Sequence, residues 1–183
     1  MPRVRSIPPE EIAASHPDLH RRLLTERKVP TANIFRALLG TPAILDAFLT
    51  YANAIRDSSI DPKLRELAIL AVGHCAKSEY ELAHHHSHAL KAGVSEAQYQ
   101  AVPQFEASQL FSAAEKAVMA FAVESSRAVD VSDATWARAA GHLPERQMIE
   151  LAMNVAWYNS GVRIMGALGI ELEEGYRKPQ TAA

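Results

Sequence analysis

Four of the eight histidines lie within five positions, in the stretch KSEYELAHHHSHALKAGVS that spans residues 77–95. Imidazole side chains titrate near neutral pH and bind metal ions, so such a cluster indicates acid/base catalysis or a metal site. A helix that carries several imidazoles without a shared role is the third interpretation. The position of each histidine on its helix helps to separate these possibilities.

The histidines fall on two faces of the helix that is predicted to carry them. With an advance of about 100° per residue, His86 lies on the apolar face, where we predict a hydrogen-bonded core or interface residue. His84, His85 and His88 lie on the opposite face together with Glu81. The four histidines therefore do not act as one group. The apolar face consists of Leu82, Ala83, Ala89 and Leu90.

The spacing of His84 and His88, four residues apart, lets two imidazoles bind one metal ion. However, the sequence lacks the His-Glu-x-x-His pattern, and no third ligand can be identified at a distance along the chain. Acid/base work by one histidine near a buried glutamate is chemically simpler, because a carboxylate can orient the imidazole. We therefore predict acid/base chemistry without a metal or another cofactor.

Glu66 is the candidate for that glutamate. It lies in PKLRELAILAVGHCA, residues 62–76, which has apolar residues at nearly every turn and is predicted to be a central helix. Because burying a lone carboxylate is costly, a buried Glu66 needs a partner, either Arg65 of a neighbour or a histidine. The alternative is that Glu66 lies on the one exposed stripe of the helix.

The composition limits the classes of protein to consider. The chain has 183 residues, enough for one domain with a core, and a formal net charge of −2. Without a basic stripe that includes aromatic residues, nucleic acid is not an expected partner. The only cysteine, Cys75, excludes an intramolecular disulfide and a Cys-x-x-Cys redox pair. We predict no signal peptide and no membrane span, and therefore a soluble, cytoplasmic protein.

The sequence predicts an all-α fold, because alanine is frequent and strand-like alternation is hard to find. Thr41 and Asp61 each precede a proline and are predicted N-caps. Ser78, Ser95 and Ser112 each begin a capping box, with Glu or Gln three residues later. The first 15 residues and the tail from residue 171 are predicted to be irregular or docking segments. Helices are predicted over residues 17–27, 31–39, 42–56, 62–76, 79–92, 95–101, 113–127, 133–140, 145–158 and 160–168.

The segments RELAILAV, residues 65–72, and IELAMNVA, residues 149–156, share Glu-Leu-Ala followed by apolar residues. Each follows a loop that contains a proline. Two related helical halves would explain this similarity, and chance similarity between alanine-rich buried helices explains it equally well.

The order of these features resembles the carboxymuconolactone decarboxylase and alkylhydroperoxidase-D-like (AhpD-like) superfamily over residues 31–170. The most specific segment is LRELAILAVGHCAKSEYELAHHHSHALKAGVS. The resemblance implies an AhpD-like helical bundle with two related halves, with residues 1–30 as an N-terminal extension and 171–183 as a tail. By register, Glu66 takes the place of the family's central glutamate and His85 that of its histidine.

The sequence departs from the peroxidase branch of this superfamily, which carries two cysteines at the start of the second helix. Ser78 and Glu81 occupy the matching positions here, and neither forms a sulfenate or a disulfide. Cys75 lies three residues earlier without a resolving cysteine. A thiol peroxidase that uses Cys75 alone and a binding protein without catalysis remain the alternative hypotheses.

The decarboxylase branch keeps a Tyr-Glu-x-x-x-His pattern and, as the resemblance implies, removes CO2 from a lactone acid of aromatic catabolism without a cofactor. His85 is then the acid, Glu66 orients it, and Tyr80 lines the pocket. Arg163 is a candidate to hold an anionic group of the substrate, and Arg65 is another. The resemblance also implies a homo-oligomer, either a trimer or a hexamer.

Overall fold

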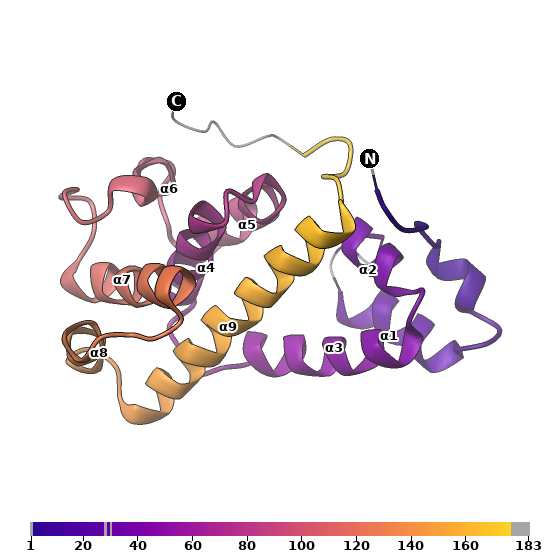
Figure 1. Cartoon of the computed structure of the whole chain (residues 1–183), viewed down its shortest axis with the longest axis horizontal. Helices are drawn as coiled ribbons and strands as arrows, with labels where there is room; N and C mark the ends of the chain where they lie inside the picture. The colour runs from indigo at the N-terminus through magenta and orange to yellow at the C-terminus, as the bar shows by residue number, and fades with distance from the viewer. Residues whose placement is uncertain (1, 28, 30, 177–183) are drawn as a thin grey trace. The chain divides into compact units, whose positions relative to one another are not determined.

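The structure is a computed structural model that describes residues 2–27, 29 and 31–176 (Figure 1). These residues form α-helices and short 3-10 helices without any β-strand, which confirms the all-α prediction. None of the helices in the described ranges combines the length and the apolar character needed to cross a membrane. The α-helices are α1 (Pro17–Glu26), α2 (Asn33–Leu38), α3 (Pro42–Arg56), α4 (Pro62–Cys75), α5 (Glu79–Lys91), α6 (Glu96–Ala101), α7 (Ala113–Ala128), α8 (Asp133–Ala140) and α9 (Glu145–Leu168).

The predicted helix boundaries are confirmed to within two residues except at the C-terminal end. There, the predicted helices over 145–158 and 160–168 form one continuous helix, α9. The predicted break at Asn159 is wrong: α9 runs through this residue, whose side chain donates to the Val155 carbonyl at 3.0 Å and to Ser126 Oγ at 2.8 Å. The first 15 residues, predicted to be irregular, contain one 3-10 helix, Pro9–Ile12.

Side-chain caps explain where several helices begin. Asp61 accepts hydrogen bonds from the backbone N–H groups of Lys63 and Leu64, as predicted. Both halves of the capping boxes that begin at Ser95 and Ser112 are present. Thr41 occupies the N-cap position of α3, as predicted, but its hydroxyl donates to the Leu38 carbonyl, so the predicted side-chain cap is absent.

The described part of the chain divides into two compact units. The first contains the residues up to 57 and residues 163–175, and the second contains residues 58–162 and Tyr176. In the first unit, α1, α2 and α3 enclose an apolar core, and Arg22 of α1 pairs with Asp46 of α3. The division of the chain at residues 30 and 170 into an extension, a domain and a tail remains a prediction. Part of the predicted tail lies outside the described residues. The core residues of this unit are Ile12, Leu19, Leu23, Leu38, Leu39, Leu45 and Leu49.

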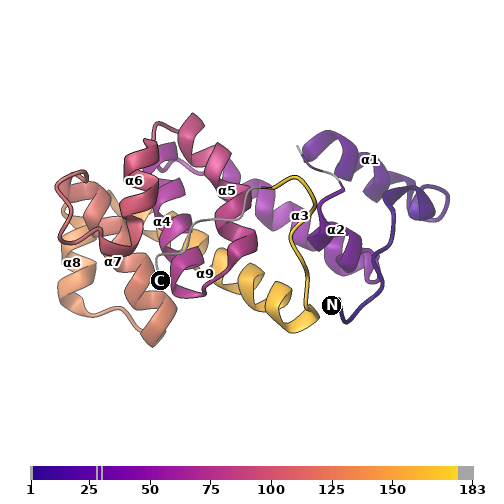
Figure 2. The same ribbon diagram turned by 90° about the horizontal axis from the view of Figure 1, so that it is seen from above.

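In the second unit, α4 is the central helix, as predicted. It packs against α5 and α7, and α7 packs against α8 (Figures 1 and 2). Every residue from Glu66 to Gly73 is buried. A helix that is apolar on nearly all sides is stable when neighbours surround it, so this arrangement explains the apolar sequence of α4.

Gly73 allows α4 and α5 to approach closely. A Cβ atom at this position would lie 3.0 Å from Cδ2 and 3.2 Å from Cγ of Leu82, a fully packed residue of α5. Overpacking a core costs roughly 1–3 kcal/mol, whereas alanine is favoured over glycine within a helix by about 1 kcal/mol. Since the cost of overpacking exceeds the gain in helix propensity, a side chain at position 73 would be destabilising. Glycine at this position therefore allows the close spacing of α4 and α5.

We therefore expect Gly73→Ala to lower the free energy of unfolding by about 1 kcal/mol, measured by urea denaturation. Gly161→Ala in α9 is the matched control, because a Cβ built there meets no heavy atom within 4 Å beyond the local backbone of its own helix. The control is expected to raise stability by up to about 1 kcal/mol. Equal effects of the two substitutions would contradict the close contact.

Candidate functional site

A short connection between α4 and α5 positions the candidate site. Residues Ala76 to Ser78 join the two helices, and Lys77 adopts a left-handed backbone with a φ of 52°. Ser78 Oγ then accepts a hydrogen bond from the Glu81 backbone N–H at 3.2 Å, which fixes the start of α5. The two helices lie side by side, so residues at equal distances from the turn can meet (Figure 2).

Glu66 of α4 and His85 of α5 meet in this way. His85 Nδ1–H donates to Glu66 Oε2 at 2.8 Å. The Glu66 residue is 6% exposed, so it does not lie on an exposed stripe of α4. The predicted hydrogen bond between these two side chains is therefore present, and a histidine is the partner of the buried carboxylate.

Glu81 is a third member of the site, although the sequence pattern predicts another role for it. Its Oε1 lies 3.1 Å from Nε2 of His85, one turn further along α5. The pattern predicts that Glu81 completes a capping box with Ser78, but the described hydrogen bonds contain only the half in which Ser78 accepts. The spacing of Glu81 and His85, four residues apart on one helix face, is the sequence feature that indicates this contact.

The imidazole of His85 is thus held between two carboxylates. Burial alone would lower the pKa of His85, but the charges and hydrogen bonds of Glu66 and Glu81 outweigh this effect and raise the pKa to about 10. Burial would raise the pKa of Glu66, yet the charge and hydrogen bond of His85 lower it. Near neutral pH, the site therefore holds an imidazolium ion with a carboxylate at each ring nitrogen.

Two further aromatic rings border His85. The Tyr158 ring of α9 meets it edge-on, with centroids 5.0 Å apart and an interplanar angle of 88°. The His88 ring of α5 lies 5.6 Å away. Tyr158 is not among the residues predicted for the site, because it lies far from α5 in the sequence and only the packing of α9 brings it near.

Tyr80 contacts a neighbouring histidine in place of His85. Its ring stacks on His84 at 4.3 Å, and the ring of Tyr176 stacks on the other face of His84 at 4.2 Å. Tyr80 itself is buried, with 8% of the residue exposed. The predicted role of Tyr80 beside a substrate pocket remains a prediction.

The two candidate arginines lie in different environments. Arg163 is exposed on α9 and belongs to the first compact unit, so its predicted role toward an anionic substrate remains a prediction. Arg65 is partly buried and directly precedes Glu66, and its charge contributes to the lowered pKa of Glu66 after the larger effects of burial and the histidines. Arg65 is therefore a cation whose field reaches the site.

The remaining histidine of the cluster, His86, is hydrogen-bonded as predicted. Its Nε2–H donates to Glu96 Oε2 at 2.8 Å, and its ring meets Tyr99 edge-on. Among the described residues, no group of three or more histidine, cysteine or acidic side chains has the arrangement of a metal site. The arrangement of Glu66, His85 and Glu81 suits proton transfer.

Cys75 ends α4 away from these three residues, where it lines a separate cavity with Arg127. Burial raises the pKa of the Cys75 thiol, and the Arg127 guanidinium opposes this effect only in part. A thiol that stays protonated is a poor nucleophile. The environment of Cys75 therefore does not favour the thiol peroxidase hypothesis.

Residues 42–124, which include α3 to most of α7, match the carboxymuconolactone decarboxylase family. No curated protein matches the sequence significantly. The sequence match contains Glu66, Glu81 and His85. The single cysteine agrees with a branch that lacks the Cys-x-x-Cys pair.

Solved structures share the fold at low sequence identity. A cysteine-to-alanine variant of the debrominase Bmp8, in complex with 2,3,4-tribromopyrrole, is 20% identical, with a TM-score of 0.80 and with 93% of this chain and 91% of that chain covered. A peroxidase-related protein from Ralstonia eutropha JMP134, described as an alkylhydroperoxidase AhpD core, is 19% identical, with a TM-score of 0.78 and 92% of each chain covered. A peroxidase-related protein from Silicibacter sp. TM1040 is 16% identical, with a TM-score of 0.79 and coverages of 96% and 94%. The chain thus has the AhpD-like fold.

Proposed function

We infer that this chain belongs to the carboxymuconolactone decarboxylase and AhpD-like superfamily and that it is a cofactor-free acid/base enzyme of the decarboxylase type. The proposed substrate is a small carboxylated lactone or a similar intermediate of aromatic catabolism. One observation carries the proposal: the His85 ring is held at both nitrogens, by Glu66 at 2.8 Å and by Glu81 at 3.1 Å.

The proposed reaction needs an acid and no electron carrier. When a carboxylate leaves as CO2, the electron pair of the broken carbon–carbon bond remains on the substrate and is delocalised toward a carbonyl oxygen. The carbon then takes up a proton. A cationic acid is suited to this step because it stabilises the negative charge as that charge develops.

The three residues have different roles in this proposal. Glu66 makes the shorter contact and holds the Nδ1–H side of His85, which fixes the ring orientation. The proton at Nε2 is shared with Glu81, so the pair of His85 and Glu81 is the proposed acid. After the proton passes to the substrate carbon, water restores it.

The proposed cation for the substrate carboxylate is either Arg163 or Arg65, and the electrostatic contribution of Arg65 at Glu66 supports Arg65. Tyr80 is proposed to border the substrate. A homo-oligomer is also proposed, and it would cover exposed apolar side chains of α9 such as Ile149, 58% exposed, and Met153, 45% exposed.

The direct test is CO2 release from carboxymuconolactone. The wild-type chain is expected to release CO2, and His85→Ala is expected to lose at least about 10²-fold in rate, because no other imidazole takes its place between the carboxylates. His86→Ala is the matched control, since His86 lies in the same helix but pairs with Glu96. Its rate should stay close to that of the wild type.

If the folded wild-type chain released no CO2 from this or related lactone acids, the proposed activity would be wrong and the binding-protein hypothesis would remain. Equal rates for His85→Ala and the wild type would exclude His85 as the acid. A circular dichroism spectrum of each variant shows whether the helices remain intact.

A further inference from the structure

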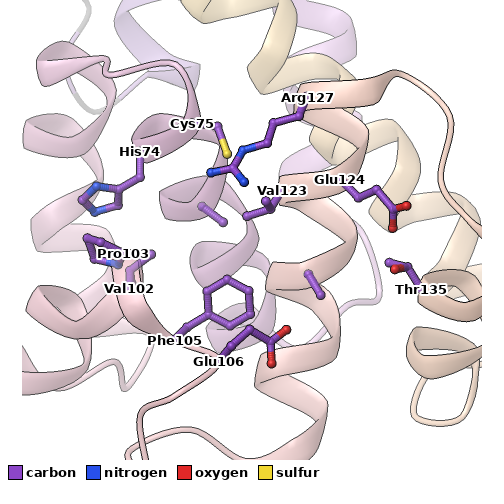
Figure 3. A pocket seen from close by; sticks show the side chains of 12 residues that line it. His74, Cys75, Val102, Pro103, Phe105, Glu106, Val123, Glu124, Arg127 and Thr135 are labelled. Atoms are coloured by element: carbon purple, nitrogen blue, oxygen red, sulfur yellow. The ribbon is translucent and has the colours of Figure 1, made fainter.

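The second compact unit contains a cavity of about 480 Å³ that is separate from the Glu66 and His85 site. It lies between the C-terminal end of α4, the chain around the 3-10 helix Val102–Gln104, and α7 (Figure 3). Its volume is within the range of about 300–1,000 Å³ that is typical of small-molecule sites. The cavity is therefore large enough for a compact organic ligand.

Apolar side chains form much of the wall. Phe105 presents its ring to the cavity, and Val102 and Val123 lie near it on two different elements (Figure 3). Phe105 is itself largely buried, so its position is fixed by packing. A flat or compact apolar group would find a preformed surface here.

Two carboxylates also line the cavity, and both are already engaged. Glu106 accepts two hydrogen bonds from Arg138, at 2.6 Å and 3.0 Å. Glu124 accepts hydrogen bonds from the backbone N–H and the hydroxyl of Ser132, at 3.1 Å and 3.2 Å. The hydrogen bonds of both acids thus go to Arg138 and Ser132 rather than to Arg127, the other charged group of the cavity.

Arg127 points toward Cys75 in Figure 3. Among the described residues, the Cys75 thiol interacts with the Arg127 guanidinium, and burial keeps the pKa of that thiol raised. Since a protonated thiol carries no charge, it does not neutralise this guanidinium. A carboxylate is the group that its planar set of N–H donors binds best.

His74 supplies a second polar group to the same cavity. Its Nε2 is buried and has no hydrogen-bond partner in the described structure. Burial lowers the pKa of His74, so the ring is neutral at pH 7 and Nε2 can donate or accept one hydrogen bond.

We propose that this cavity is a binding site for a small carboxylic acid with an aromatic or similarly compact apolar body. The carboxylate pairs with Arg127, and the body packs on Phe105 and the two valines. This inference does not rest on the proposed decarboxylase activity.

The sole cysteine allows a direct test with benzoate as the probe. In the full-length chain, benzoate is expected to slow the alkylation of Cys75 by iodoacetamide, whereas benzamide, its neutral analogue, is not expected to do so at the same concentration. Saturation-transfer NMR of benzoate measures binding independently of the thiol. Arg127→Gln should raise the dissociation constant about tenfold or more, the usual effect of removing a charged hydrogen-bond donor.

Arg146→Gln is the matched control. It also removes one positive charge, but Arg146 is largely exposed, pairs with Glu150 and does not line the cavity. Benzoate binding to this variant should match that of the wild type. Equal protection by benzoate and benzamide, an absence of benzoate binding, or a dissociation constant unchanged in Arg127→Gln would each overturn the proposal. Arg127 is exposed, so the substitution should leave the fold intact.

Discussion

Glu81→Gln is expected to lower the rate of CO2 release by about 10²–10⁴-fold, the usual contribution of a positioned acid or base. Glutamine keeps the size and a hydrogen-bonding oxygen of Glu81, but it cannot share or carry a proton. The contact between Glu81 and His85 at 3.1 Å predicts that this loss appears in kcat more than in KM. Steady-state kinetics with carboxymuconolactone measure both constants.

Glu79→Gln is the matched control for this prediction. Glu79 lies two residues earlier in the same helix, is exposed and is not part of the His85 contacts. The control is expected to keep its rate within about twofold of the wild type, since it removes the same charge from the same turn. If Glu81→Gln retained full activity, His85 would have to act without the shared proton.

The second prediction with a large expected effect concerns how the free energy of unfolding depends on pH. The free energy of unfolding is expected to fall as the pH rises from about 6.5 toward about 10. In this interval, folded His85, whose pKa is raised to about 10, keeps a proton that the unfolded chain releases near 6.5. Raising the pH therefore favours the unfolded state. This stabilisation is complete below about pH 6.5 and is lost above about pH 10.

Glu66 has the opposite dependence on pH. Its pKa is lowered in the folded protein, because His85 outweighs the effect of burial. Its contribution is present above the ordinary value of 4.5 and is lost as the pH falls through the lowered folded value. Both contributions are complete together between about pH 4.5 and 6.5, which is the interval of maximal stability expected from this pair.

Glu66→Gln tests this dependence. The substitution is expected to lower the free energy of unfolding by about 3 kcal/mol near pH 6, the lower end of the range for breaking a buried ion pair, because Glu81 still neutralises His85. The alkaline decrease should still begin near pH 6.5, where the unfolded chain releases the proton, but it should end at a lower pH, since the folded-state pKa of His85 falls when one carboxylate is removed.

Urea denaturation at about pH 6, 8 and 10 gives the three profiles to compare. Glu79→Gln should follow the wild type throughout, which separates the site from the general effect of net charge. Superimposable profiles for Glu66→Gln and the wild type would show that the ion pair does not stabilise the fold.

The pairing of Glu66 with His85 was predictable from local features. The caps at Asp61 and Ser78 fix where the two helices begin, and a short turn makes them neighbours. Distances along each helix then place the two side chains at a similar height. The family resemblance singled out the same two residues from their register.

Other parts of the site could not be read from local patterns. Glu81 fits a capping box and also lies one turn before His85, and the sequence gives no measure of which contact is stronger. Tyr158 reaches His85 only through the packing of α9. The cavity beside Cys75 is formed by four separate segments of the sequence, so its existence depends on packing that no local pattern encodes.

The stack of Tyr80, His84 and Tyr176 has a consequence for spectroscopy. The His84 imidazole lies between two phenol rings at 4.3 Å and 4.2 Å, nearly parallel to both. Protons held above and below aromatic faces experience ring currents that move their NMR resonances upfield. The ring protons of His84 should thus be resolved from those of the other histidines, and they provide a label-free reporter one residue away from His85.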